Sequence, residues 1–172
     1  MAIIKFRPWF KAKHPAAIPA SLYKPIGQIL VGYTYTELYM QSIAWHVLRL
    51  RDPKAARLLT IGRNAIDLEK LFRSLTPQWI KDQADAKELL DIHAKAQRIR
   101  ADRNKLAHGI WGYKPGQKPR QMRLFYLREN EQKIKPEAMF ITQSLLETWV
   151  ANLAALNAQI KAFHRKLGAP VP

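Results

Sequence analysis

Apolar residues recur along most of the chain at alternating spacings of three and four, the period of an amphipathic helix. Four such segments follow one another, at about 21–50, 53–75, 77–108 and 142–167. The first segment is apolar on more than one face, which favours a central, buried helix. Asp52-Pro53 and Thr76-Pro77 are typical of helix starts, and Thr142 is the expected N-cap of the last helix. The pattern predicts an all-α fold, an up-down antiparallel bundle of about four main helices.

Two segments depart from this helical period. Residues 1–20 contain three prolines, which forbid a continuous helix, so we expect an extended basic arm there. Residues 109–141 are interrupted by glycine and proline, and their apolar stretch from Met122 to Leu127 is partly β-like. We therefore expect a single helical domain over 21–168, with a basic loop or small hairpin at 109–141.

The charge of the chain changes this picture. Its 172 residues carry 29 Lys and Arg against 13 Asp and Glu, a formal net charge of +16. Residues 1–24, 95–113 and 114–135 carry +5, +4 and +5, which is 14 of the 16 excess charges. Basic segments on a nearly neutral scaffold suit a polyanion such as nucleic acid. The alternative is that the charge serves solubility alone.

Several classes of protein are disfavoured by what the chain lacks. It has no cysteine, which excludes disulfides, thiolate zinc sites and cysteine nucleophiles and agrees with a reducing cytoplasm. No uniformly apolar run reaches the ~20 residues of a membrane span. The histidines other than His108 are scattered without metal-ligand spacing, and no glycine-rich phosphate loop occurs. We expect a cytoplasmic protein with no membrane contact, no metal and no other cofactor.

The third helical segment carries the candidate chemistry near its end. Its apolar residues recur every three or four positions and form a row, the seam, that faces the other helices. Arg103 falls in this seam, where a bundle requires an apolar residue. A cation in a seam is costly unless it is paired or lines a cleft. Arg100, Asn104 and His108 are spaced four apart and share one ridge of the helix. A cation, an amide and an imidazole therefore converge at one helix end, and Gly109 is a natural stop for that helix.

This set of groups can perform metal-free phosphodiester chemistry. The imidazole of His108 can accept or donate a proton near neutral pH. Arg103 can hold a phosphate with two parallel hydrogen bonds, and RNA supplies its own nucleophile, the 2′-hydroxyl. The alternative is structural: Arg103 in an interhelical salt bridge and His108 at its own helix C-terminus.

The segment Arg103-Asn104-Lys105-Leu106-Ala107-His108 resembles the Arg–four-to-six–His motif of the HEPN (higher eukaryotes and prokaryotes nucleotide-binding) superfamily. Asn after Arg and Gly after His are typical of that motif. The resemblance implies a homodimer whose motifs face each other across a cleft, and a metal-independent endoribonuclease acting as a toxin, in phage defence or in RNA processing. It implies Arg103 as phosphate ligand, Asn104 as orienting residue and His108 as acid and base.

The resemblance also bears on regulation and on supporting residues. Glu37, the only acid of the first helix, is expected to pair with Arg103, and Arg100 to support the site. Many toxin members that pair with an antitoxin protein carry a tyrosine two residues after the histidine. Ile110 occupies that position here, so regulation through that tyrosine is not expected.

RNA is the expected partner, and candidate RNA-binding residues surround the motif. Trp111 and Tyr113 can stack a base or pack against the loop. The cations expected to follow the RNA backbone are Lys105, Lys114, Lys118, Arg120, Arg123 and Arg128. The alternative function is a non-catalytic HEPN-like module that binds nucleic acid or a protein partner through its basic surface.

Overall fold

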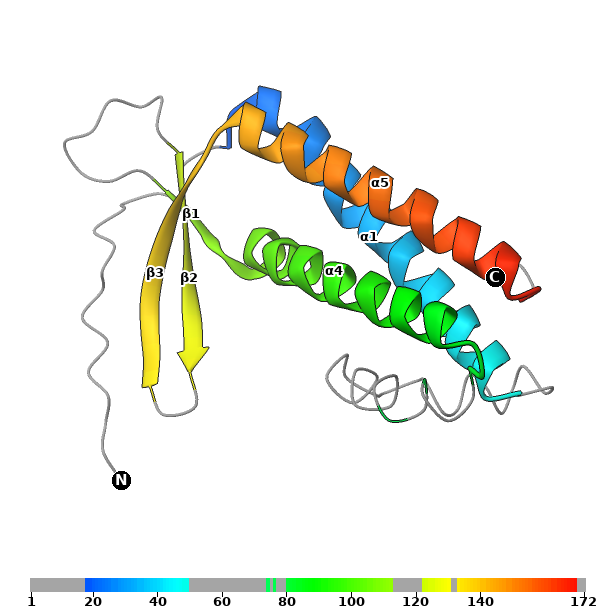
Figure 1. The fold of residues 1–172 in the computed structure, drawn as a ribbon. Helices are drawn as coiled ribbons and strands as arrows, with labels where there is room; N and C mark the ends of the chain where they lie inside the picture. The colour runs from blue at the N-terminus through cyan, green and yellow to red at the C-terminus, as the bar shows by residue number, and fades with distance from the viewer. Residues whose placement is uncertain are drawn as a thin grey trace.

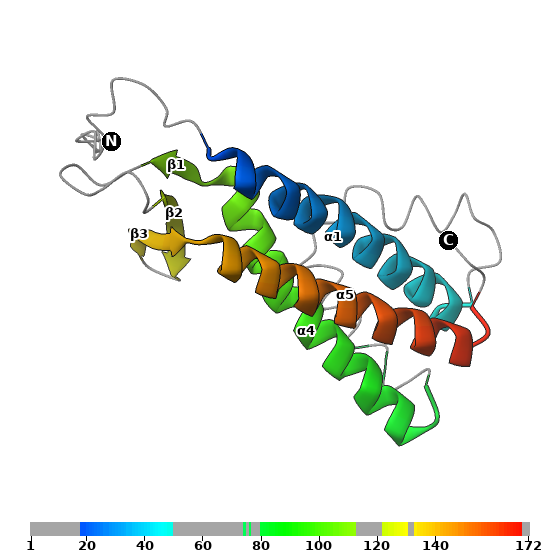
Figure 2. The ribbon, with the colours of Figure 1, turned by 90° about the horizontal axis from the view of Figure 1, so that it is seen from above.

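The computed structural model describes residues 18–49, 74, 76, 80–112, 122–130 and 133–169. Three long helices dominate these residues: α1 (Ala20–Val47), α4 (Gln83–His108) and α5 (Gln143–Lys166). Figures 1 and 2 show them lying side by side as a bundle, with a small sheet at one end. The mostly helical fold is confirmed. The arm expected at 1–20 and the helix expected at 53–75 fall almost entirely outside the described residues.

The helix boundaries follow the local signals in the sequence. Asp82 caps α4, because its Oδ1 accepts hydrogen bonds from the backbone N–H of Ala84 at 2.7 Å and of Asp85 at 3.0 Å. Residues 80–82 are not helical, and α4 begins at Gln83. Thr142 caps α5 by accepting from the N–H of Leu145 at 3.1 Å. Gly168, with a φ of +65°, follows the end of α5.

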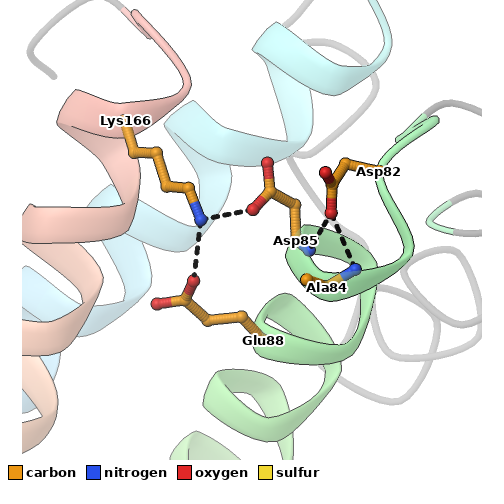
Figure 3. Close-up of polar contacts among 5 residues, drawn as sticks. All are labelled: Asp82, Ala84, Asp85, Glu88 and Lys166. Carbon is orange, nitrogen blue, oxygen red and sulfur yellow. Dashed lines mark hydrogen bonds and ion pairs between the residues drawn. The ribbon is translucent and has the colours of Figure 1, made fainter.

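The start of α4 and the end of α5 are joined by an ion pair network (Figure 3). Lys166 Nζ lies against Asp85 and, at 3.3 Å, against Glu88 Oε2. The hydrogen bonds that Lys166 donates to Asp85 and Glu88 raise its pKa. All three side chains are partly exposed, so the network orients the two helix ends more than it stabilises them.

We expect the Asp82 cap to be sensitive to pH. The hydrogen bonds from the backbone N–H of Asp85 and of Ala84 lower the pKa of Asp82. A carboxyl whose pKa is lower in the folded state stabilises the fold above its ordinary pKa, and this contribution is lost as pH falls through the lowered value. Asp82→Ala should therefore lower Tm at neutral pH and have less effect at strongly acidic pH. Asp82→Asn, which caps without titrating, is the control, and an equal loss for Asp82→Ala at both pH values would contradict the prediction.

The helices enclose one core cluster. Its largest fully buried members are Ile43, Leu89, Ile92, Ile160 and Phe163, contributed by all three helices. The α1–α5 contact is close because Gly32 has no side chain: a Cβ there would lie 2.8 Å from Leu153 Cδ2. Two hydrogen bonds fix the register of the two helices. Asn157 Nδ2 donates to the carbonyl of Gly32 at 3.1 Å, and Thr36 Oγ1 donates to Asn157 Oδ1 at 2.8 Å.

A three-stranded antiparallel sheet lies at one end of the bundle, in the order β1 (Ile110–Gly112), β2 (Met122–Asn130), β3 (Lys133–Ile141). The hairpin predicted within 109–141 is present as β2 and β3. Each strand has nine residues, which is longer than the apolar stretch Met122–Leu127 in the sequence. The third strand, β1, was not expected, because three residues are too few to show a period of two. It begins directly after α4 and pairs with β2, with Trp111 opposite Leu124.

The sheet has an inner and an outer face. Met122, Leu124 and Ile141 are buried, and the last two join a second core cluster that includes Leu106 of α4 and Leu146 of α5. Because strand residues alternate between faces, their neighbours point the other way. This outer face carries Ile110, Arg123 and Phe140.

Candidate active site

Apolar residues in the seam of α4 are buried, as their spacing in the sequence predicts. Leu89, Ile92, Ala96 and Leu106 are buried. Arg103 is half-buried in the same row, so the helix does place an arginine in an apolar seam. The groups around its guanidinium decide whether this position is structural or functional.

Arg103 is held by an aromatic ring and an amide rather than by an acid. Its Cζ lies 5.8 Å from the centre of the Tyr33 ring on α1, and its Nη1 donates to Asn104 Oδ1 at 3.0 Å. Its Nε is buried and has no hydrogen-bond partner in the described part of the chain. Within that part Arg103 forms no ion pair, so an interhelical salt bridge does not explain its position.

Tyr33 connects α1 to the charged groups around Arg103. Burial raises the pKa of its hydroxyl far above the ordinary value, and the charge of Glu37 adds to this. Arg100 and Arg103 act in the opposite direction. One hydroxyl thus lies within electrostatic reach of two arginines and one glutamate. The sequence pattern does not identify Tyr33, because helical spacing does not tell which face of α1 meets α4.

The two supporting residues occupy this neighbourhood without direct contact to Arg103. Among the described residues no ion pair joins Glu37 to Arg103, and Glu37 is half-exposed on α1. Arg100 Nη1 donates to Gln97 Oε1 at 3.3 Å, one turn earlier on α4. The predicted pairing of Glu37 with Arg103 is therefore not formed here, although both residues lie close to Tyr33.

His108 is the last residue of α4, and it is exposed. It makes no hydrogen bond or ion pair with another described residue. The helix terminus is closed by the N–H of Gly109, which donates to the carbonyl of Lys105 at 2.8 Å. Asn104 lies one turn before His108, and its amide oxygen is engaged by Arg103. The arrangement links the arginine, the amide and the exposed imidazole along the last turn and a half of one helix.

The predicted RNA-binding residues have different surroundings. Lys105 Nζ pairs with Asp102 at 2.9 Å, and Trp111 is half-buried against the second core cluster. Arg123 lies on the outer face of the sheet, and for Arg128 only its place on β2 is described. The others lie outside the described residues: Tyr113, Lys114, Lys118 and Arg120.

Other polar features of the helices are structural or separate from the motif. The buried His164 bonds to Ser42 Oγ at 2.9 Å, and the buried His93 contacts Gln97 at 3.3 Å. A groove of about 420 Å³, lined in part by Lys95, Arg98 and Trp149, opens beside α4 and α5, and neither Arg103 nor His108 lines it.

The described residues lack a metal-binding cluster and a membrane-spanning helix. They contain no group of three or more His, Asp and Glu side chains placed to hold a metal ion. Within the same ranges, no helix combines the length and apolarity needed to cross a membrane.

Comparison with known proteins adds no relative. No family model, no curated protein and no solved structure matches the chain. The HEPN resemblance therefore depends on the motif at Arg103–His108 and on the mostly helical fold.

Proposed function

We propose that this chain is a metal-independent endoribonuclease of the HEPN type, in which Arg103 binds the scissile phosphate, Asn104 orients the site and His108 transfers protons. The observation that carries the proposal is the surroundings of the half-buried Arg103 side chain. An arginine in a helix seam, with a buried Nε, is costly for stability, and the described residues give it an aromatic ring and an amide but no acid. A bound phosphate would give this cation its counter-charge.

The chemistry requires no group beyond those of the site and the RNA. The 2′-oxygen attacks phosphorus while its proton passes to a base, and the bond from phosphorus to the 5′-oxygen breaks as that oxygen receives a proton. The products are a 2′,3′-cyclic phosphate and a 5′-hydroxyl. An exposed imidazole suits the proton transfers, and the guanidinium group of Arg103 suits the negative charge that develops on the phosphate.

The proposal includes an assembly and a biological role. Residues 53–75 would complete a four-helix bundle, and two copies of the chain would bring two motifs together, as the family resemblance implies. The role implied is that of a toxin or phage-defence effector, which an antitoxin protein would restrain. Light scattering on the purified protein tests the homodimer directly, since the chain mass is 19.9 kDa.

The function is tested with end-labelled single-stranded RNA in excess EDTA. We expect cleavage to products with 2′,3′-cyclic phosphate and 5′-hydroxyl ends. RNA carrying a 2′-O-methyl group at the cleaved position should resist, because its nucleophile is blocked. Products with 3′-hydroxyl ends, or cleavage abolished by EDTA, would contradict the proposal. Binding of all substrates without cleavage would instead favour the non-catalytic module.

Tyr33 is expected to position Arg103, because its ring faces the guanidinium group from the adjacent helix. Tyr33→Leu removes the ring and should lower kcat about 10- to 100-fold, the loss caused by a misplaced catalytic group. Tyr33→Phe keeps the ring and should retain activity. The comparison is made under single turnover with matched fold by circular dichroism. If both variants lost activity equally, the hydroxyl rather than the ring would be required, and the positioning role would be wrong.

A further inference from the structure

The outer face of the sheet exposes large apolar side chains that the fold does not use. Ile110 on β1 is 60% exposed and Phe140 on β3 is 47% exposed. The inner face already fills the second core cluster through Leu124 and Ile141. The side chains of the outer face therefore contribute little to stability and present apolar surface to solvent.

Arg123 lies between these two strands on the same face. Its partners across the ladder are Gly112 on β1 and Phe140 on β3. Its Cζ is 4.0 Å from the centre of the Phe140 ring, which is a close stacking distance for a guanidinium group. Gly112 is buried and has no side chain, so from β1 only backbone lies opposite Arg123.

The polar atoms of Arg123 are poorly satisfied. Its Nε is buried and has no hydrogen-bond partner in the described ranges, and no ion pair to Arg123 is formed there. A guanidinium group that no acid neutralises can take the phosphate of a bound strand as its counter-charge. The outer face thus combines an exposed aromatic ring, a cation stacked on it and an exposed aliphatic side chain.

The charge of the chain determines which partner fits this face. With a net charge of +16, the protein attracts polyanions. Among polyanions, nucleic acid also has aromatic bases that stack on exposed rings and on arginine planes. The bases must be unpaired to do so, which favours a single strand. The strand β1 begins two residues after His108, so Ile110 of this face is close along the chain to the candidate active site.

We infer that the outer face of the sheet, formed by Ile110, Arg123 and Phe140, is a stacking platform for the bases of single-stranded RNA. The inference depends on the proposed function only in taking RNA as the partner, and it adds the site that holds the strand outside the cleavage motif. Phe140 stacks a base, and Arg123 contacts the adjoining phosphate.

Binding is measured apart from cleavage. The probe is a fluorescent 2′-O-methyl oligoribonucleotide, which cannot undergo 2′-hydroxyl attack, and its partner is an abasic strand of equal length and charge. Phe140→Ala should weaken binding of the base-bearing strand about 5- to 100-fold by anisotropy. Binding of the abasic strand should be unchanged, and Phe140→Tyr should bind both strands as wild type. Tyr35→Ala, which removes a 56% exposed ring from α1, is the matched control and should have no effect.

Other outcomes would overturn the inference. One is wild-type affinity of Phe140→Ala for the base-bearing strand, and another is equal loss for both strands. A change of mass on Phe140→Ala in light scattering would identify the face as a contact between copies of the chain. Failure of the proposed ribonuclease is distinguishable, because it would leave stacking-dependent binding intact while unmodified RNA stays uncleaved.

Discussion

His108→Ala should abolish cleavage of single-stranded RNA. Loss of a proton-transfer group lowers rates by about 10²- to 10⁴-fold, so the residual activity would be close to background. The exposed imidazole forms no hydrogen bond or ion pair with another described residue, and its removal should therefore leave the free energy of unfolding nearly unchanged. RNA affinity should also be retained, because the phosphate ligand Arg103 and the outer face of the sheet are intact. The measurement is the single-turnover cleavage rate in EDTA beside the unfolding curve of the same sample.

The chain offers a matched control for this variant. His46 lies in the last turn of α1, as His108 lies in the last turn of α4, so His46→Ala removes a histidine from an equivalent helix position. It should cleave at the wild-type rate. Equal cleavage by wild type and His108→Ala would show that the proton-transfer group is elsewhere, and an equal loss in both variants would indicate a general effect of helix termini.

Gly109→Ala is expected to have the largest effect on stability. Gly109 joins α4 to β1, and a Cβ there would lie 2.5 Å from both the Lys105 carbonyl oxygen and Leu124 Cδ1. The backbone oxygen cannot move without opening the last turn of α4, and Leu124 is fully buried. We expect a loss of about 3 kcal/mol in the free energy of unfolding, at the upper end of overpacking effects. Urea denaturation followed by far-ultraviolet circular dichroism measures it.

Gly27→Ala provides the opposite case. Gly27 lies inside α1, and a Cβ there meets nothing within 4 Å. The same substitution should therefore stabilise the protein by about 0.5–1 kcal/mol through helix propensity. If Gly109→Ala and Gly27→Ala had the same free energy of unfolding, the inference that Gly109 is packed too closely to carry a side chain would be wrong.

The helical part of the fold follows from local signals that act within a few residues. Thr142 caps α5 and Asp82 caps α4 because a side-chain oxygen next to free backbone N–H groups is a local interaction. The position of Arg103 in the seam of α4 follows from the period of one helix alone. These features need no knowledge of the rest of the chain.

The features that sequence pattern does not predict depend on contacts between distant segments. Tyr33 meets Arg103 only because a particular face of α1 turns toward α4. Trp111 points inward and Ile110 outward, and this alternation is visible only once β1 is known to pair with β2. Phe140 falls in a stretch interrupted by proline, where strand pairing rather than composition gives it an exposed position.

The close packing of α1 on α5 affects how the chain is made. A large part of the buried face of α1 packs against α5, through Leu153 and Asn157, near the far end of the sequence. A ribosome adds about 5–20 residues per second, so α1 spends several seconds with an uncovered apolar face before α5 emerges. Contacts between segments this far apart also slow folding. Nascent chains should consequently need chaperone protection until synthesis is complete, and a chain that stops before residue 143 lacks the partner that buries α1.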